Sequence, residues 1–173
     1  MTLEQELVHE LLSRHITITA AESITAGEFQ STLGNVAGVS EVFEGGFVTY
    51  SNRVKEQLLH IPSEVIDENG VVSEPTAIWM ANQARSIMDK DLAVSFTGSA
   101  GPDTLEGNPA GTVWIGIAYG TQQTYAKKYL FKGDRNGIRK AAVDAGLKMA
   151  IEIIHKWSNF CSHFDCFFWK SLV

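Results

Sequence analysis

The residues of this sequence that could carry out chemistry stand where predicted strands give way to loops or helices. Ser23 follows one strand and precedes a helix, where a hydroxyl can cap the helix, bind an anion or act as a nucleophile. Tyr50 and Lys55 flank the next such junction. A buried lysine can have a pKa low enough for a general base, and a tyrosine can relay a proton or orient a substrate. Each residue also has a structural interpretation, as a helix cap, an edge aromatic or a solvated charge.

A third junction, residues 97–102 (TGSAGP), places hydroxyls and backbone N–H groups in a loop of small residues. Such a loop can cradle an anion or form an oxyanion hole, or it can be a plain turn. It is not a nucleophile elbow, because Ser99 directly follows Gly98. Arg135, in a turn before the last predicted helix, could grip a phosphate with two hydrogen bonds or pair with Asp134.

No residue set predicts a metal site. His9 and Glu10 begin like a zinc-protease motif, but position 13 holds serine instead of the second histidine. Cys161, His163 and Cys166 are close in sequence, yet their spacing matches no known zinc pattern. We therefore predict neither a metal site nor a bound cofactor.

The elements that must position these residues alternate between strand and helix patterns. Alternating and β-branched runs predict strands at 16–21, 43–50, 91–97, 111–118 and 123–132. Apolar spacing and capping residues predict helices at 3–14, 26–33, after Ser51-Asn52, after Pro62, at 73–88 and at 138–155. This order indicates an α/β fold with helices on both faces, and the last two strands form an antiparallel pair. Ligands of such sheets bind beyond the carboxyl ends of the strands, so we expect the three junctions to form one site.

Composition restricts the function further. The chain has 173 residues, 45% of them hydrophobic and 20% charged, which is typical of one globular domain. A net charge of −6 argues against direct nucleic-acid binding, which needs a basic face. The acidic N-terminal segment lacks a signal-peptide core, and no run of about 18 apolar residues predicts a membrane span. We expect a cytoplasmic protein that does not associate with membranes.

Six short motifs together resemble the CinA C-terminal domain family, which contains nicotinamide-mononucleotide amidohydrolases. Each motif alone is weak, but their common order and spacing are specific. The resemblance runs from about residue 3 to residue 156, so we assign 1–156 to the domain. The aromatic-rich tail 157–173 has no assigned role and could dock on a subunit interface, be disordered or form an irregular extension. The motifs are 21–27 (AESITAG), 45–52 (GGFVTYSN) followed by Lys55, 70–74 (GVVSE), 97–102 (TGSAGP), 109–113 (PAGTV) and 133–135 (GDR).

The resemblance implies hydrolysis of nicotinamide mononucleotide to nicotinate mononucleotide and ammonia. It also implies a three-layer α/β/α fold with a mixed, mostly parallel five-stranded sheet, and assembly as a homo-oligomer, either dimer or trimer. In that chemistry Ser23 is the expected nucleophile, Lys55 the base and Tyr50 a relay or orienting group, while Thr97 holds the substrate or the oxyanion. The expected substrate-binding residues are Thr25, Gly27, Gly46, Gly98, Ser99 and, as the phosphate ligand, Arg135.

Alternatives stay open at this point. In one variant Thr97 is the nucleophile and the Ser23 loop binds phosphate. Ile24 and Ala26 stand where the family usually has cysteine and glycine, and Ser99 where isoleucine is common. These departures fit two other hypotheses: a non-catalytic competence- or DNA-damage-associated partner of a recombination protein, and a hydrolase of a different amide or nucleotide.

Overall fold

The strands form one mixed sheet with the order β2-β1-β3-β4-β5, as a computed structural model of residues 1–121 and 123–161 shows. Strands β1, β2 and β3 are mutually parallel, whereas β4 pairs antiparallel with both β3 and β5. Of the described strands, β4 alone runs against the rest, so the predicted mixed, mostly parallel sheet is confirmed. The bounds are β1 Ile18–Glu22, β2 Phe47–Val48, β3 Leu92–Gly98, β4 Thr112–Tyr119 and β5 Gln123–Leu130.

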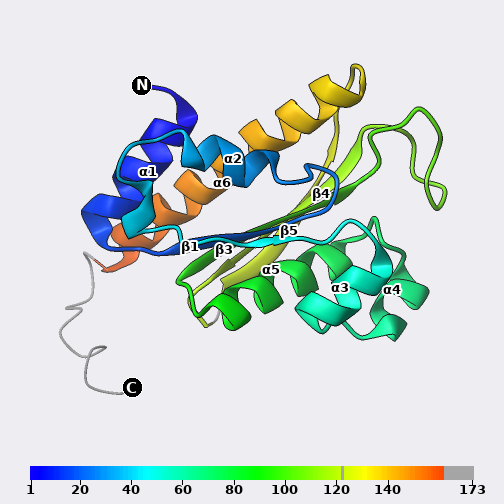
Figure 1. Ribbon diagram of the computed structural model, residues 1–173, viewed down its shortest axis with the longest axis horizontal. Helices are drawn as coiled ribbons and strands as arrows, with labels where there is room; N and C mark the ends of the chain where they lie inside the picture. Colours follow the sequence, from blue (N-terminus) through cyan, green and yellow to red (C-terminus); the bar gives the residue numbers. More distant parts are fainter. Residues whose placement is uncertain (122, 162–173) are drawn as a thin grey trace.

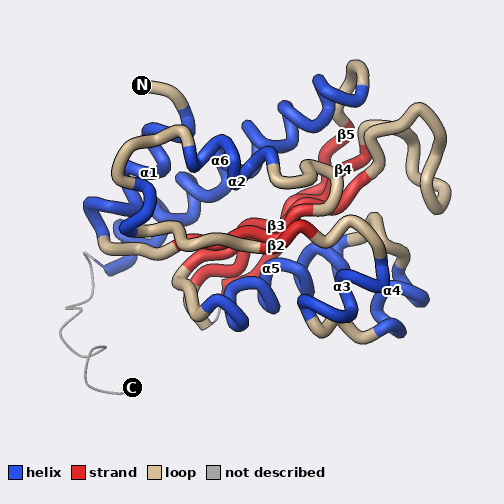
Figure 2. The backbone as a smooth tube through the Cα atoms, viewed as in Figure 1, coloured by secondary structure: helices blue, strands red, loops and turns tan. Residues whose placement is uncertain are grey.

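Helices cover both faces of this sheet, which gives the three layers visible in Figures 1 and 2. One layer contains α1 (Leu3–Arg14), α2 (Glu28–Gly34) and the long α6 (Arg135–Cys161), with a short 3-10 helix at Val39–Glu41. The other contains α3 (Asn52–Leu59), α4 (Ser63–Asn69) and α5 (Glu74–Met88). Each layer packs on its own apolar cluster. The interior strand β1 is therefore buried on both faces along its whole length.

Local sequence signals explain where the helices next to the site begin. The Ser51 hydroxyl caps α3 by accepting a hydrogen bond from the Val54 amide at 3.3 Å. The Ser73 hydroxyl caps α5 in the same way, and a proline occupies the first turn of α5. Both helices start where the sequence predicted, and α3 directly follows the carboxyl end of β2.

The second strand is much shorter than the predicted 43–50. Phe43 makes a single parallel bridge with Ile18, and regular pairing resumes only at β2. Between them, Gly46 passes so close to β1 that a Cβ there would lie 2.5 Å from the Ala20 carbonyl oxygen. Gly45 has φ 152, in the region that favours glycine. The glycine pair thus interrupts the ladder that the alternating pattern predicted.

Helix α6 is longer at both ends than the predicted 138–155. It begins at Arg135 because Asp134 caps it: the Asp134 carboxylate accepts from the Gly137 amide at 2.8 Å. Its last turns extend into the predicted tail, where the Trp157 ring meets the Tyr119 ring edge-on at 6.3 Å. Residues 162–173 of that tail lie outside the described residues. Among the helices described, none combines the length and apolar character that crossing a membrane requires.

Candidate active site

A cavity of about 440 Å³ lies beyond the carboxyl ends of β1 and β3, where the three predicted junctions meet. Its wall combines Ser23, Tyr50 and the 97–101 loop with Arg135 and residues 103–106 of the loop before β4. The volume is within the range of small-molecule sites, about 300–1,000 Å³. The structure therefore brings residues of the three junctions together around one cavity.

Ser23, which lines this cavity, forms a buried pair with Lys55, which is not among the lining residues. The Lys55 side chain is fully buried, and its Nζ lies 3.1 Å from Ser23 Oγ and 2.8 Å from the Thr49 carbonyl oxygen. Ser23 is 8% exposed, and its backbone amide donates to the Phe96 carbonyl of β3 at 2.9 Å. Strand β3 thus holds the serine while α3 delivers the lysine.

Burial makes the Lys55 amine easier to deprotonate than that of an ordinary lysine. Burial lowers the pKa of Lys55 from 10.5 to about 8, and the Glu106 carboxylate acts in the opposite direction, raising that pKa. A neutral amine has a lone pair that can accept the Ser23 hydroxyl proton, which an ammonium cannot do. The pair can therefore generate a serine nucleophile near neutral to mildly alkaline pH.

We expect Glu106→Gln to lower the pKa of Lys55 below about 8, because the carboxylate charge that favours the ammonium is removed. Glutamine keeps a carbonyl oxygen for the Val71 amide, which donates to Glu106 Oε2 at 2.7 Å, so the loop should hold its place. The measurement is an NMR titration of lysines labelled at the ε position, with Lys55→Met assigning the signal. Glu152→Gln, on α6, is the matched control and should leave the Lys55 titration unchanged. An unchanged or higher pKa in Glu106→Gln would contradict the electrostatic account.

The Thr97 hydroxyl is bonded differently from the Ser23 hydroxyl. Thr97 is 1% exposed and donates its hydroxyl proton to the Val71 carbonyl at 2.6 Å. Ser99 Oγ lies 3.4 Å from both the Asp103 carbonyl oxygen and the Gly101 amide nitrogen. A carbonyl oxygen is far too weak a base to activate a hydroxyl, whereas a neutral lysine is strong enough. The geometry therefore favours Ser23 over Thr97 as the nucleophile.

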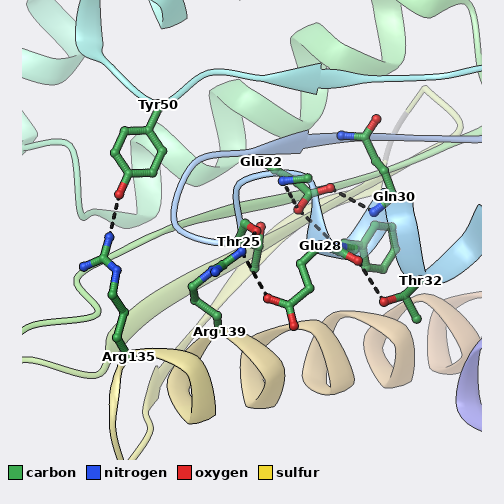
Figure 3. A network of polar contacts seen from close by, with 10 residues as sticks. Glu22, Thr25, Glu28, Gln30, Thr32, Tyr50, Arg135 and Arg139 are labelled. Atoms are coloured by element: carbon green, nitrogen blue, oxygen red, sulfur yellow. Dashed lines mark hydrogen bonds and ion pairs between the residues drawn. The ribbon is translucent and has the colours of Figure 1, made fainter.

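Arg135 and Tyr50 form a polar pair on the rim of the cavity (Figure 3). Arg135 Nη2 donates to the Tyr50 hydroxyl at 2.6 Å, and Nη1 donates to the Gly101 carbonyl at 3.1 Å. Tyr50 is 57% exposed. Among the described residues its hydroxyl has no hydrogen bond to Ser23 or Lys55, so of the two predicted roles this geometry supports orienting the substrate more than relaying a proton.

Three residues predicted to bind substrate are not among those that line the cavity. The Gly27 amide donates to the Glu22 carboxylate at 3.0 Å, and the Thr25 carbonyl accepts from Arg139 Nη2 at 2.8 Å. Gly46 packs against the backbone of β1. These contacts hold the loops around Ser23, whereas Gly98 and Ser99, also predicted to bind substrate, line the cavity.

Two acidic residues at the site were not selected from the sequence. Glu22 is fully buried and accepts three backbone N–H groups, and Glu106 links the 103–106 loop to the segment before α5. A signal for Glu22 was available, since a carboxylate ends an otherwise uncharged strand just before a helix. No comparable signal marks Glu106 in its polar loop. Within the described part of the chain, no three His, Cys, Asp or Glu side chains gather to hold a metal ion.

Comparisons with known proteins agree with one another. The family model of the CinA C-terminal domain matches residues 1–154. A competence-damage inducible protein of Lactiplantibacillus plantarum is 51% identical over 148 residues, covering 86% of this chain and 35% of that protein. One from Listeria welshimeri is 46% identical over 149 residues, covering 86% of this chain and 36% of its own length. The chain thus spans about a third of the length of these relatives.

Solved structures of the same superfamily share the architecture. A CinA superfamily protein from Klebsiella pneumoniae has a TM-score of 0.87 at 28% identity, covering 90% of this chain and 97% of that one. Another, from Escherichia coli, has a TM-score of 0.84 at 30% identity, covering 87% of this chain and 88% of that one. The mixed sheet with helices on both faces is therefore an architecture known from experiment.

Proposed function

The chain belongs to the CinA C-terminal domain family, and from that membership and the site geometry we propose that it hydrolyses the carboxamide of nicotinamide mononucleotide. The products would be nicotinate mononucleotide and ammonia. One observation carries the proposal: the Nζ of the fully buried Lys55 lies 3.1 Å from the Oγ of Ser23, and Ser23 lines a cavity whose wall is rich in hydroxyl groups. A nucleophile beside a base of lowered pKa is what amide hydrolysis without a metal requires.

In the proposed reaction, Ser23 Oγ attacks the carboxamide carbon and its proton passes to the neutral Lys55 amine. The tetrahedral intermediate collapses as the Lys55 ammonium returns the proton to the leaving nitrogen, so ammonia departs and an ester to Ser23 remains. Water, activated by the same lysine, then hydrolyses the ester. The loop of Thr97 and Gly98 also lines the cavity and is our candidate for holding the developing oxyanion.

We expect Arg135→Ala to raise the KM for nicotinamide mononucleotide by about 10- to 100-fold with little change in kcat, because a charged hydrogen bond contributes about 1.5–3 kcal/mol. Arg135 lies on the rim, where its guanidinium could exchange Tyr50 and the Gly101 carbonyl for phosphate oxygens. Nicotinamide riboside, which lacks the phosphate, should be processed equally by the variant and the wild type. Arg53→Ala is the control, because Arg53 is exposed on α3 and bonded to Gln57. Equal losses for the riboside and the nucleotide would contradict the phosphate role.

The direct test is incubation of the purified chain with nicotinamide mononucleotide, followed by assays of ammonia and of nicotinate mononucleotide. Thermal melting with and without the nucleotide reports binding separately, because a ligand of the folded state raises the melting temperature. Binding without ammonia release would move the assignment to a hydrolase of another amide or nucleotide. Neither binding nor release would favour the non-catalytic partner protein. Size-exclusion chromatography with light scattering tests the proposed homo-oligomer.

A further inference from the structure

The buried carboxylate of Glu22 organises the segment that carries Ser23. Glu22 is 0% exposed, and its Oε2 accepts from the Gly27 and Phe29 amides at 3.0 and 3.1 Å. Its other oxygen, Oε1, accepts from the Gln30 amide at 2.9 Å. Figure 3 shows this carboxylate among the first residues of α2. Glu22 therefore supplies hydrogen-bond acceptors to amides at the start of α2 that have none within the helix.

The turn between Glu22 and α2 adopts a conformation that its sequence disfavours. Ala26 has φ 50 and Gly27 has φ 93, both in the left-handed region. For a non-glycine residue such as Ala26 that region costs about 1–2 kcal/mol. The bond from the Gly27 amide to Glu22 closes this turn, so the carboxylate holds the loop in its observed shape.

The main chain of Glu22 is connected through Thr49 to Lys55, the partner of Ser23. The Thr49 amide donates to the Glu22 carbonyl at 2.8 Å, and the Thr49 carbonyl accepts from Lys55 Nζ at 2.8 Å. Ser23 follows Glu22 directly in the chain. One residue thus positions the serine through its side chain and the lysine through its main chain.

We propose that Glu22 is a positioning residue that sets the reactive geometry of the Ser23–Lys55 pair by holding the Ser23 loop on its carboxylate. The inference rests on the proposed function only in taking this pair as the reactive centre. It goes beyond a helix cap, because a cap alone would affect stability and leave the reactivity of Ser23 unchanged.

The test uses Glu22→Gln and a probe that needs no nucleotide, phenylmethanesulfonyl fluoride. In its reaction the Ser23 Oγ–S bond forms, the S–F bond breaks, fluoride leaves and the serine proton passes to Lys55. Glutamine replaces one acceptor oxygen with an NH₂ donor that faces a backbone N–H. We expect the second-order labelling rate of Ser23, followed by mass spectrometry, to fall by about 10- to 100-fold, the penalty typical of a displacement of about 1 Å. The pKa of Lys55, followed by NMR, should rise from about 8 as the loosened loop admits water.

Two further variants separate positioning from lost stability. Ser95→Ala removes a buried hydroxyl of β3 that donates to the Ala77 carbonyl at 2.6 Å, and Ser95 does not line the cavity. It should lower the melting temperature yet keep the wild-type labelling rate. Glu22→Asp keeps the negative charge, but its side chain is one methylene too short to reach the same amides, so it should also slow the labelling of Ser23. This variant replaces Glu22→Gln in the test if Glu22→Gln fails to fold.

The outcomes distinguish the two proposals. Wild-type labelling rates in folded Glu22→Gln or Glu22→Asp would overturn the positioning role, and so would a wild-type Ser23 that does not react with the probe. If the wild type reacts at Ser23 and the Glu22 variants do not, the positioning role stands even when nicotinamide mononucleotide is not hydrolysed. In that case only the proposed substrate fails.

Discussion

Ser23→Ala is expected to lower ammonia release from nicotinamide mononucleotide by at least about 10³-fold, because the nucleophile is removed. The variant should fold, since the Ser23 side chain is small and Lys55 Nζ keeps its bond to the Thr49 carbonyl at 2.8 Å. Binding should persist, so the nucleotide should still raise the melting temperature of the variant. Steady-state ammonia release measures the loss, and thermal melting confirms that the protein is intact.

Thr97→Val is the matched control for this prediction. It removes the other candidate hydroxyl and preserves side-chain shape, at the cost of leaving the Val71 carbonyl without its 2.6 Å donor. If Ser23 is the nucleophile, Thr97→Val should retain far more activity than Ser23→Ala. Full turnover in Ser23→Ala together with an inactive Thr97→Val would reverse the two roles.

Lys55→Met is expected to abolish turnover to a similar extent, because methionine fills a similar volume without a basic nitrogen. In the wild type, kcat/KM should rise with pH and level off above about pH 8, since Lys55 must be neutral to accept the serine proton. At pH 7 only about a tenth of the molecules would hold a neutral lysine with that pKa. The measurement is the pH dependence of kcat/KM for wild type and variant. A wild-type rate that falls as the pH rises through 8 would contradict the assignment of Lys55 as the base.

The same variant should alter the pH dependence of stability with a defined sign. The pKa of Lys55 is about 8 in the folded chain against 10.5 for an unperturbed lysine, a difference worth about 3 kcal/mol. Between pH 8 and pH 10.5 the unfolded chain binds more protons than the folded chain, so the stability of the wild type rises with pH through that window. Below pH 8 the folded chain bears the full free-energy cost of burying a charged lysine. The stability of Lys55→Met relative to wild type should therefore be greatest below pH 8 and decline towards pH 10.5. Denaturant unfolding at pH 7 and pH 10 measures this, with Lys148→Met, an exposed lysine of α6, as the control.

Much of the architecture was predictable because it depends on local patterns. Alternation of strand and helix patterns indicated the α/β class, and the hydroxyls at Ser51 and Ser73 marked the starts of α3 and α5. The rule that ligands bind beyond the carboxyl ends of strands pointed to the edge of the sheet where the cavity lies. The local pattern predicted a second strand that was too long, because a tertiary contact sets its length. The close approach of Gly46 to β1 shortens this strand to Phe47–Val48.

By itself, the sequence determined the class of fold, the three junctions and the residue types available there. Only the tertiary structure decided which of those residues meet. Ser23 and Lys55 are 32 positions apart, and Tyr50 and Arg135 are 85 apart, yet each pair is joined by a hydrogen bond. Burial makes Lys55 different from an ordinary solvated lysine. The hydrogen bond from its hydroxyl to the Val71 carbonyl makes Thr97 different from Ser23. Backbone preferences and apolar periodicity act over a few residues, whereas hydrogen-bond partners, desolvation and pKa depend on which distant segments pack around a group.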